Sequence, residues 1–362
     1  MAVALGVGAV ATFATTPRTL APTTDSTLPP AFVPPKVAAR TALVAHVDAT
    51  RRVDFLMLTA TGGDTPAEVL FLPPATVTDV PSLDRQPLAA LVRLGGPGLL
   101  SMTVTNLTGI RVDRTVLLDD SAFATIIGAV PRFTPVFAAA AVVDGGAIAV
   151  PAGAVPITAS QGVRLILGRE DAGTLAHLAT VQAVLDGWCA VLRHDGAARV
   201  QAARVDGGTP LVAMCTAAPV LHADTLPVDD VDTGSGERFE VRPAELERLV
   251  ASEFPSARVA DGAPRPRVEL LNGVGTVGLA TRAAAVLVPA GAHVTLTDNL
   301  AQFGQATTEI LYYRDSDLAA ARRLRTVLGI GVVGRSATPL DVVDITVVLG
   351  ADFARTHTRS AP

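Results

Sequence analysis

The chain has 362 residues, a formal net charge of −5 at pH 7, 49% hydrophobic residues and a mean hydropathy of +0.42. This length suits two or three domains, and the apolar composition is sufficient for large hydrophobic cores. Lys36 is the only lysine, so arginine supplies nearly all positive charge, and no basic cluster offsets the negative balance. The charge pattern therefore argues against nucleic acid as a partner.

The N-terminus has the composition of a membrane attachment followed by a tether. Residues 1–16 are small and apolar, which favours a membrane anchor. The segment is too short for a full span and no basic residue precedes it, so it could also be the remnant of an anchor. Residues 17–38 are rich in proline and threonine, as is typical of an extended linker. If these two segments are an anchor and a tether, the rest of the chain is expected to lie outside the cytoplasm. The alternative is a cytoplasmic protein in which the apolar N-terminal segment is buried.

A long helix is predicted in the middle of the chain. Its apolar stripe is formed by Leu178, Val181, Leu185, Trp188 and Leu192. His177 flanks this stripe, so we expect it to be neither a base nor a metal ligand.

The two cysteines leave two alternatives open. Cys189 lies on the long helix and Cys215 on a predicted apolar strand, so they either form a disulfide or are separately buried. No two histidines, and no histidine and cysteine, have metal-ligand spacing, so the sequence predicts no zinc site.

A seam between two domains follows. Residues 225–243 are acidic and contain glycine and serine, and Leu246, Leu249, Val250 and Phe254 then define a short amphipathic helix. We assign residues 223–265 to a linker that contains this helix. Few contacts are expected to cross it, so the C-terminal domain should fold alone.

Residues 268–287 resemble a dinucleotide-binding fingerprint. A strand ends at Asn272, and Gly273, Gly275 and Gly278 have the spacing that such sites use for a tight turn and close pyrophosphate approach. Too few residues remain, however, to complete a doubly wound domain. Nucleotide binding is therefore the minor interpretation, and the glycines are expected to serve a turn and close helix packing.

The rest of this segment predicts a small domain. A strand over residues 307–313 precedes a helix that begins at Ser316 and ends at Gly329. The predicted order is strand, helix, strand, strand, helix, strand, strand, which makes a small α/β sandwich. Residues 266–354 resemble the C-terminal domain of LytR-type cell-envelope proteins, in the opening at 268–278 and in the closing strand VVLGADF at 347–353.

The preceding residues 39–222 resemble a LytR-CpsA-Psr (LCP) domain, the enzyme type that moves glycopolymers from polyprenyl-pyrophosphate carriers onto peptidoglycan. Residues 51–58 and 69–81 resemble the first two core strands. Residues 104–130 resemble a helix end, a glycine turn, a strand and a second helix, and the long helix follows the position of an arginine loop. The resemblance implies an α/β fold, with an LCP-like α/β/α domain ahead of the small α/β sandwich.

The catalytic motifs of that family look degenerate. An Arg-Asp pair that would clamp pyrophosphate and a divalent ion is replaced by Pro74 and Ala75. Two further arginines of the family are replaced by His177 and Thr180. Because pyrophosphate transfer needs several phosphoryl oxygens neutralised at once, we expect no catalytic, cofactor-binding or metal-binding residues.

Asp54 and Arg169 are the vestigial candidates. Asp54 matches an aspartate of the family's first strand, but it could simply accept a backbone hydrogen bond or pair with Arg51 or Arg52. Arg169 belongs to a short charge run with Glu170 and Asp171, which more commonly marks a solvated helix start.

The sequence thus predicts a non-catalytic binding or scaffolding protein of cell-wall glycopolymer assembly in the cell envelope, anchored in the membrane through its N-terminus. Its expected partners are cell-wall polymer, polyprenyl lipid or envelope proteins. The alternative is an active phosphotransferase, with magnesium as its cofactor and with Arg85, Arg93 or Arg132 replacing the missing arginines. The arginine, alanine, glycine, valine and proline content suggests a GC-rich, actinobacterial genome.

Overall fold

The computed structural model describes most of the chain after the predicted tether. The proposed anchor and tether at 1–38, and Asp171, lie outside the described residues. The described ranges are 39–62, 67–81, 83–170, 172–217, 222–231, 236–260, 264–336 and 342–357.

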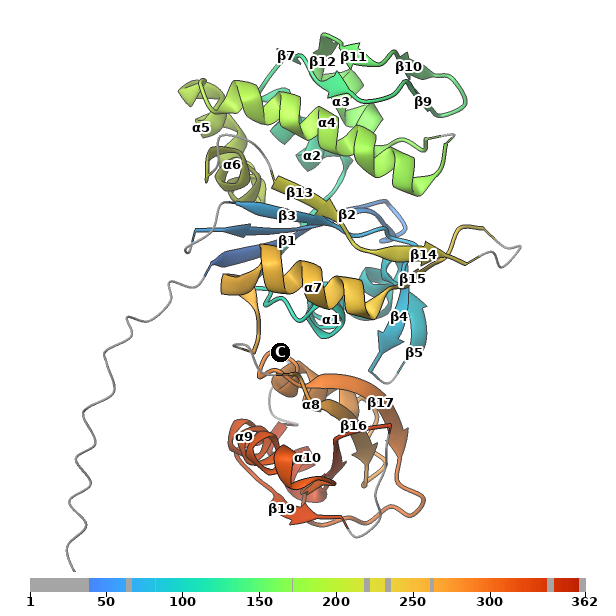
Figure 1. Cartoon of the computed structure of the whole chain (residues 1–362), viewed down its shortest axis with the longest axis vertical. Coiled ribbons are helices and arrows are strands. Elements are labelled where there is room, and N and C mark those ends of the chain that lie inside the picture. The colour runs from blue at the N-terminus through green and yellow to red at the C-terminus, as the bar shows by residue number, and fades with distance from the viewer. Residues whose placement is uncertain are drawn as a thin grey trace, which may run out of the picture. The chain divides into compact units, whose positions relative to one another are not determined.

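A five-stranded sheet of order β13-β3-β2-β1-β6 forms the centre of the first domain (Figure 1). β1 is parallel to β6 and β3 is parallel to β13, whereas β2 is antiparallel to both β1 and β3. Four strands therefore run in one direction, and their carboxyl ends meet at one edge with the amino end of β2. The strands are β1 (Arg40–Val47), β2 (Val53–Thr61), β3 (Glu68–Phe71), β6 (Arg114–Leu118) and β13 (His222–Thr225).

Both faces of this sheet are buried, which explains its near-continuous apolar strands. On β2, Phe55 and Met57 join one core, and Leu56 and Leu58 join the other. Helices α2 to α6 cover the first face, and α1 and α7 cover the second (Figure 1). The helices are α1 (Leu91–Thr108), α2 (Asp120–Gly128), α3 (Ala159–Leu167), α4 (Thr174–Leu192), α5 (Gly196–Arg204), α6 (Gly208–Ala217) and α7 (Pro243–Glu253).

Short strands and single helical turns complete this domain. β4 pairs with β5, β7 with β12, β8 with β11, β9 with β10, and β14 with β15. The strands are β4 (Val77–Val80), β5 (Asp84–Pro87), β7 (Arg132–Phe133), β8 (Val136–Phe137), β9 (Ala141–Val143), β10 (Ile148–Val150), β11 (Gly153–Ala154), β12 (Ile157–Thr158), β14 (Val228–Asp230) and β15 (Phe239–Val241). The turns are η1 (Leu88–Ala90) and η2 (Pro255–Ala257).

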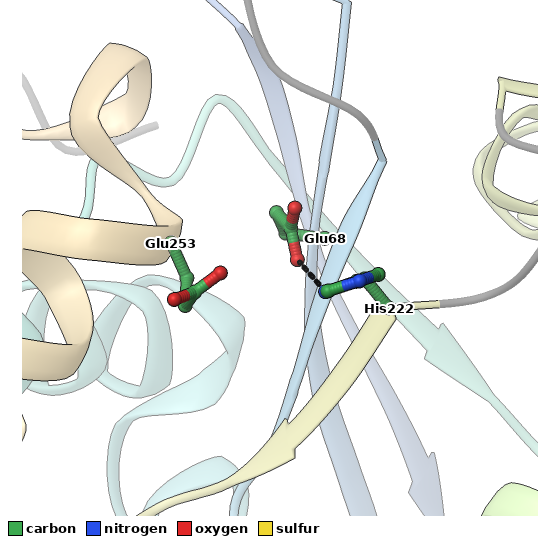
Figure 2. A group of neighbouring side chains, drawn as sticks. All are labelled: Glu68, His222 and Glu253. Carbon is green, nitrogen blue, oxygen red and sulfur yellow. Dashed lines mark ion pairs between the residues drawn. The ribbon is translucent and has the colours of Figure 1, made fainter.

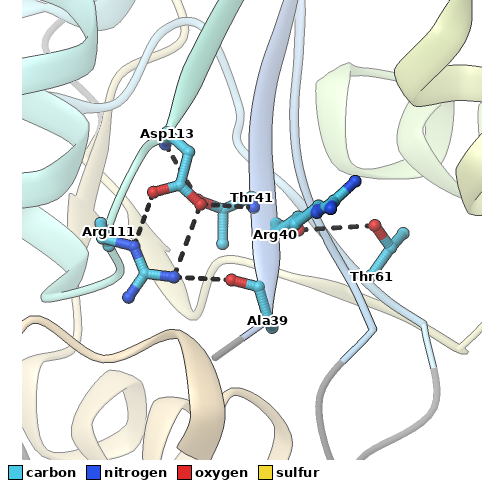
Figure 3. A network of polar contacts seen from close by, with 6 residues as sticks. All are labelled: Ala39, Arg40, Thr41, Thr61, Arg111 and Asp113. Atoms are coloured by element: carbon cyan, nitrogen blue, oxygen red, sulfur yellow. Dashed lines mark hydrogen bonds and ion pairs between the residues drawn. The ribbon is translucent and has the colours of Figure 1, made fainter. Parts of the chain in front are cut away.

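Polar contacts fix the amino end of β1 (Figure 3). Thr41 donates its N–H and its hydroxyl to Asp113 Oδ2 at 2.9 and 3.1 Å. Arg111 donates to Asp113 Oδ1 and to the carbonyl of Ala39, both at 2.6 Å. Burial raises the pKa of Asp113, but the donors outweigh burial and leave that pKa below its ordinary value. The first described strand is thereby fastened to the loop ahead of β6.

The cysteines form a disulfide, Cys189–Cys215, between α4 and α6. The prediction of a strand around Cys215 is wrong: these residues form α6, which is mostly apolar and lacks the periodicity of an amphipathic helix. Its Leu211, Met214 and Cys215 are fully buried against the sheet. A short apolar run of this kind cannot be distinguished from a buried strand by pattern alone.

The C-terminal domain contains the seven predicted elements in the predicted order. Its sheet has the order β17-β16-β20-β18-β19, and α8 and α9 pack against it. The elements are β16 (Arg267–Asn272), α8 (Leu279–Leu287), β17 (His293–Asn299), β18 (Glu309–Tyr312), η3 (Asp315–Asp317), α9 (Leu318–Leu328), β19 (Val332–Arg335), β20 (Ile345–Leu349) and α10 (Ala351–His357).

Two boundaries in this domain differ from the prediction. The closing strand stops at Leu349, and Ala351 already begins α10. Asp352 holds this turn, since its Oδ1 accepts hydrogen bonds from the N–H and hydroxyl of Thr308 at 2.9 and 2.7 Å. Ser316 does not cap the second helix, which starts at Leu318 after a single 3₁₀ turn.

Contacts between the two domains are more extensive than the sequence suggested. Arg265 donates to the carbonyls of Asn106 and Ala292 at 2.9 and 2.8 Å, and Thr281 donates to the carbonyl of Pro81. One hydrophobic core also continues from α1 and α7 into α8 and β16. The expectation that few contacts cross the linker is therefore wrong.

Two helical segments of the described chain are long and apolar enough to cross a membrane, at residues Leu88–Thr108 and Thr174–Leu192. Within the fold, 56% and 50% of their apolar windows are buried. Core helices have the same length and composition, so these two segments are weak evidence for membrane insertion.

Candidate functional site

The carboxyl edge of the first sheet brings one histidine between two aspartates. His46 lies near the end of β1, Asp54 at the start of β2, and Asp120 at the start of α2. His46 Nδ1 lies 2.6 Å from Asp54 Oδ1, and His46 Nε2 lies 2.9 Å from Asp120 Oδ1. The first pair is a hydrogen bond, whereas the second has ion-pair distance without hydrogen-bond alignment.

A β-bulge directs Asp54 toward His46. His46 pairs with Phe55 and Val47 with Val53, so Asp54 has no partner on β1. Such an extra residue bends the strand and re-aims its side chain. The bulge therefore places the Asp54 carboxylate on the face of the sheet to which His46 points.

His46 is favoured as a cation by this arrangement. Its exposed fraction is only 1%, and its ring packs edge-on against Phe123 with a centroid separation of 5.8 Å. Burial lowers the pKa of His46, but the hydrogen bond and charge of Asp54, together with Asp120, outweigh burial and raise the pKa above 6.5. The result is a buried imidazole beside two carboxylates, which favour its charged form.

A second polar group lies on α4 and the segment before it. Thr180 donates its hydroxyl to Glu170 Oε2 at 2.8 Å, and His177 Nε2 lies 2.9 Å from the carbonyl oxygen of Ile166. Burial lowers the pKa of His177, although the negative charges of Glu170, Asp144 and Asp54 act in the opposite direction. The His177 and Thr180 side chains thus make local contacts.

The two vestigial candidates have different surroundings. Asp54 pairs with His46, and neither Arg51 nor Arg52 is its recorded partner among the described residues. Arg169 is exposed, and its backbone N–H donates to Asp144 Oδ1 at 2.9 Å.

The charge run at Arg169 and Glu170 had suggested that Glu170 is solvated. The structure shows that Glu170 is buried. It is 6% exposed because Thr180 satisfies its carboxylate inside the fold.

Pro74 and Ala75 follow β3 at this same edge. The carbonyl of Pro74 accepts a hydrogen bond from the N–H of Ala89 at 2.8 Å, and that of Ala75 accepts one from the N–H of Phe239 at 3.4 Å. Neither side chain carries a charge or a donor. These two residues can join the backbone to η1 and β15, but they cannot bind pyrophosphate through their side chains.

The three substitute arginines occupy other parts of the fold. Arg85 pairs with Glu240 at 3.0 Å and lines a groove of about 500 Å³ beside α7 and the C-terminal domain. Arg132 lies near the last turns of α4, where it lines a cavity with Gly187 and His194. Arg93 is exposed in the first turn of α1. Within the described residues, none of the three forms an ion pair with Asp54.

Magnesium does not fit the Asp54 position. Magnesium prefers six oxygen ligands in near-ideal octahedral geometry. The Asp54 carboxylate instead accepts a hydrogen bond from the buried ring of His46, so one of its oxygens is already engaged.

The three-glycine loop of the C-terminal domain is occupied by its own hydrogen bonds. Asn272 Oδ1 accepts from the N–H groups of Val274 and Gly275 at 3.3 and 3.0 Å, and Asn272 Nδ2 donates to the carbonyl of Thr276 at 3.0 Å. In a dinucleotide site, N–H groups of this loop point at phosphate. The loop therefore has the character of a structural turn.

Each glycine has its own role in that turn. Gly275 and Gly278 have φ of +74° and +70°, a left-handed conformation that favours glycine. A Cβ on Gly273 would lie 2.6 Å from Gln305 Cβ and 2.8 Å from the carbonyl oxygen of Leu349. Gly273 therefore lies close to the loop that contains Gln305 and to the end of β20. The sequence had predicted instead that the glycines allow close packing of a helix.

Sequence reasoning missed His46 and Asp120. An aspartate pair at 119–120, directly before a helix, signals an N-cap, and Asp119 does accept a hydrogen bond from the N–H of Ala122 at 2.8 Å. The pairing of Asp120 with His46 requires the adjacent parallel strands β1 and β6, which the linear pattern does not indicate.

Comparison with known proteins agrees with this architecture. Residues 265–353 match a family model described as the LytR cell envelope-related transcriptional attenuator, LytR_C. No curated protein matches the sequence at a significant level.

Solved structures resemble the first domain. B. subtilis TagV is 14% identical, with a TM-score of 0.51 over 61% of this chain and 97% of TagV. B. subtilis TagU is 13% identical, with a TM-score of 0.46 over 61% and 98% of the two chains. The LytR-CPS2A-psr family protein YwtF (TagT), with bound octaprenyl pyrophosphate lipid, is 13% identical, with a TM-score of 0.44 over 62% and 93%. The chain thus joins a domain with the α/β fold of TagV to a C-terminal domain that matches the LytR_C model.

Proposed function

We propose that this protein is a non-catalytic binding or scaffolding component of cell-wall glycopolymer assembly. It acts outside the cytoplasm, with a membrane attachment at its N-terminus. Cell-wall polymer, a polyprenyl lipid or another envelope protein is its partner.

The observation that carries the non-catalytic assignment is the pairing of His46 with Asp54 and Asp120 at the carboxyl edge of the sheet. Glu170 and Asp144, like Asp54, act as negative charges on His177. A like-charge pair about 5 Å apart costs on the order of 3 kcal/mol near a protein surface. An anionic pyrophosphate would therefore be repelled here.

The uncharged residues at the same edge support this assignment. Transfer from a pyrophosphate needs cations that neutralise several oxygens as the bond breaks. Pro74, Ala75 and Thr180 supply none, and the buried imidazole of this cluster, His46, is already paired with two carboxylates.

A binding role is supported by the groove beside α7. It has a volume of about 500 Å³ and is lined by residues of both domains, among them Arg85, Arg265 and Glu247. Ligand sites commonly occupy grooves between domains. The protein would then contribute to envelope assembly by holding a polymer or protein segment.

Activity and binding are tested together on the purified full chain. The protein is incubated with a polyprenyl-pyrophosphate-linked glycopolymer, peptidoglycan, and magnesium or manganese, with an active transferase in parallel as the positive control. We expect no release of phosphate and no polymer transfer, but retention of the chain on the polymer in a pull-down.

The variants Asp54→Ala, Arg85→Ala, Arg93→Ala and Arg132→Ala decide between the proposal and its alternative. Metal-dependent turnover by the wild type that Asp54→Ala abolishes would refute the non-catalytic assignment. Turnover abolished by one of the arginine variants would establish the alternative, a phosphotransferase with replaced arginines.

A further inference from the structure

Three ligand-type side chains meet at the opposite edge of the first sheet (Figure 2). Glu68 is the first residue of β3 and His222 the first residue of β13, and the two are direct partners in the parallel register. Glu253 is the last residue of α7, which covers this face of the sheet. The fold thus brings together residues separated by up to 185 positions, from Glu68 to Glu253.

The spacing of their polar atoms suits a shared ion. One ligand atom from each of the three residues lies within 4.8 Å of the other two. His222 Nδ1 lies 3.6 Å from Glu68 Oε2, which is close to the roughly 3.3 Å between neighbouring ligands of a tetrahedral zinc ion. His222 is exposed and Glu253 is half-buried, so small rotations of these two side chains can close the remaining distance.

The state of Glu68 is the independent observation that points to a ligand. Its exposed fraction is 4%, and its Oε2 atom, buried and turned toward His222, has no hydrogen-bond partner among the described residues. A buried carboxylate oxygen without a hydrogen bond is costly, and such atoms call for a specific explanation. The ion pair with His222 at 3.6 Å is too long to be a hydrogen bond.

The surrounding charges are predominantly negative. Glu253 and Asp224 place negative charge beside Glu68, and His222 is the group that acts in the opposite direction. Three carboxylates thus surround one imidazole, an arrangement that a divalent cation would neutralise.

We propose that Glu68, His222 and Glu253 form a binding site for a divalent transition-metal ion, with zinc as the ion of best fit. Imidazole favours zinc over magnesium and calcium, and three protein ligands leave one position for water or for Asp224. The bound ion fastens the end of α7 and the start of β13 to β3. Its role is structural, and it is independent of the proposed function in glycopolymer assembly.

The test uses full-length protein without an affinity tag, stripped with EDTA and then dialysed. Calorimetric titration with zinc chloride is expected to give one ion per chain with a micromolar or lower Kd. Glu253→Gln and His222→Ala each remove one ligand and should weaken binding more than about tenfold. His194→Ala, at an exposed site, is the matched control and should bind like the wild type.

Cobalt(II) provides a second measurement. Cobalt bound to the wild type should show the intense visible absorption of a four-coordinate ion, and His222→Ala should lose this absorption while keeping the wild-type circular dichroism. Because His222 is exposed, its replacement should leave the fold intact.

Three outcomes would overturn the proposal: absence of saturable zinc binding below roughly 100 µM, equal binding by His222→Ala and His194→Ala, or a preference for magnesium over zinc. The first two would remove the site, and the third would remove its assignment to a transition metal.

Discussion

Asn106 and Val294 exchange two hydrogen bonds across the boundary between the two domains. Asn106 Nδ2 donates to the carbonyl of Val294 at 2.8 Å, and the N–H of Val294 donates to Asn106 Oδ1 at 2.9 Å. Val294 belongs to β17, which is an edge strand of its sheet. The amide side chain of Asn106 therefore replaces a neighbouring strand and closes an edge that would otherwise leave buried backbone groups unpaired.

Replacing Asn106 with leucine should destabilise the whole chain. The variant removes both hydrogen bonds and leaves the N–H and carbonyl of Val294 buried without partners, since Asn106 is 3% and Val294 2% exposed. We expect a loss of about 2 to 4 kcal/mol in the free energy of unfolding, measured by urea denaturation. Asn299→Ala, at an exposed position of the same strand, should change this value by less than about 0.5 kcal/mol. Equal losses in both variants would show that the exchange does not stabilise the interface.

Gly278→Val should destabilise the C-terminal domain through its backbone. Gly278 has φ of +70° at the start of α8, but a Cβ there would meet only Arg282, at 3.7 Å. The left-handed conformation therefore sets the cost, about 1 to 3 kcal/mol for a β-branched residue. Gly278→Asn should lose less, because asparagine tolerates this conformation. Thermal unfolding compares the two variants, and the same loss in both would point to a steric cause.

The same loop also gives a prediction about ligands. Because Asn272 already accepts from two N–H groups of the turn, calorimetric titration with NAD, ATP and GTP should show no binding. Micromolar binding that Gly275→Val abolishes in a folded protein would restore the dinucleotide interpretation.

Asp54→Asn should lower the pKa of His46. The wild-type pKa is raised, because Asp54 and Asp120 outweigh the effect of burial. A raised histidine pKa contributes stability that is fully present below 6.5 and is lost as the pH rises through the folded-state value. The variant should therefore be less stable than the wild type near pH 6, and the difference should shrink at pH 9.

Histidine NMR and urea denaturation at both pH values measure these two effects. Asp48→Asn, in the exposed turn before β2, is the control for a changed carboxylate nearby. A His46 resonance with the same pKa in wild type and Asp54→Asn would contradict the assigned pairing.

Much of the fold could be predicted from the sequence, because local signals such as helix-ending glycines and the long-range packing favour the same elements. Gly329 does end α9 in a left-handed conformation, and Gly109 ends α1 in the same way. The candidate site could be predicted less well from the sequence. The hydrogen bond of Asp54 depends on a bulge opposite His46, and the Glu68 cluster depends on strand β13, which pairs with β3 after more than 150 intervening residues, from Glu68 to His222. Neither strand pairing has a signature in the local sequence.

His293 should make the protein sensitive to mild acid. Burial lowers its pKa to about 4, and the positive charges of Arg265 and Arg267 contribute in the same direction. Between pH 6.5 and 4 the unfolded chain binds a proton at this position and the folded chain does not, so stability is present above pH 6.5 and is lost as the pH falls.

His293→Gln removes this titration. From pH 7 to pH 4.5 the wild type should therefore lose about 2 kcal/mol more of its free energy of unfolding than the variant. Urea denaturation across this range provides the measurement, and His194→Gln, at an exposed site, should follow the wild type. Other acidic groups titrate equally in all three proteins, so the difference isolates His293. Parallel curves for wild type and His293→Gln would show that this imidazole is protonated in the folded protein.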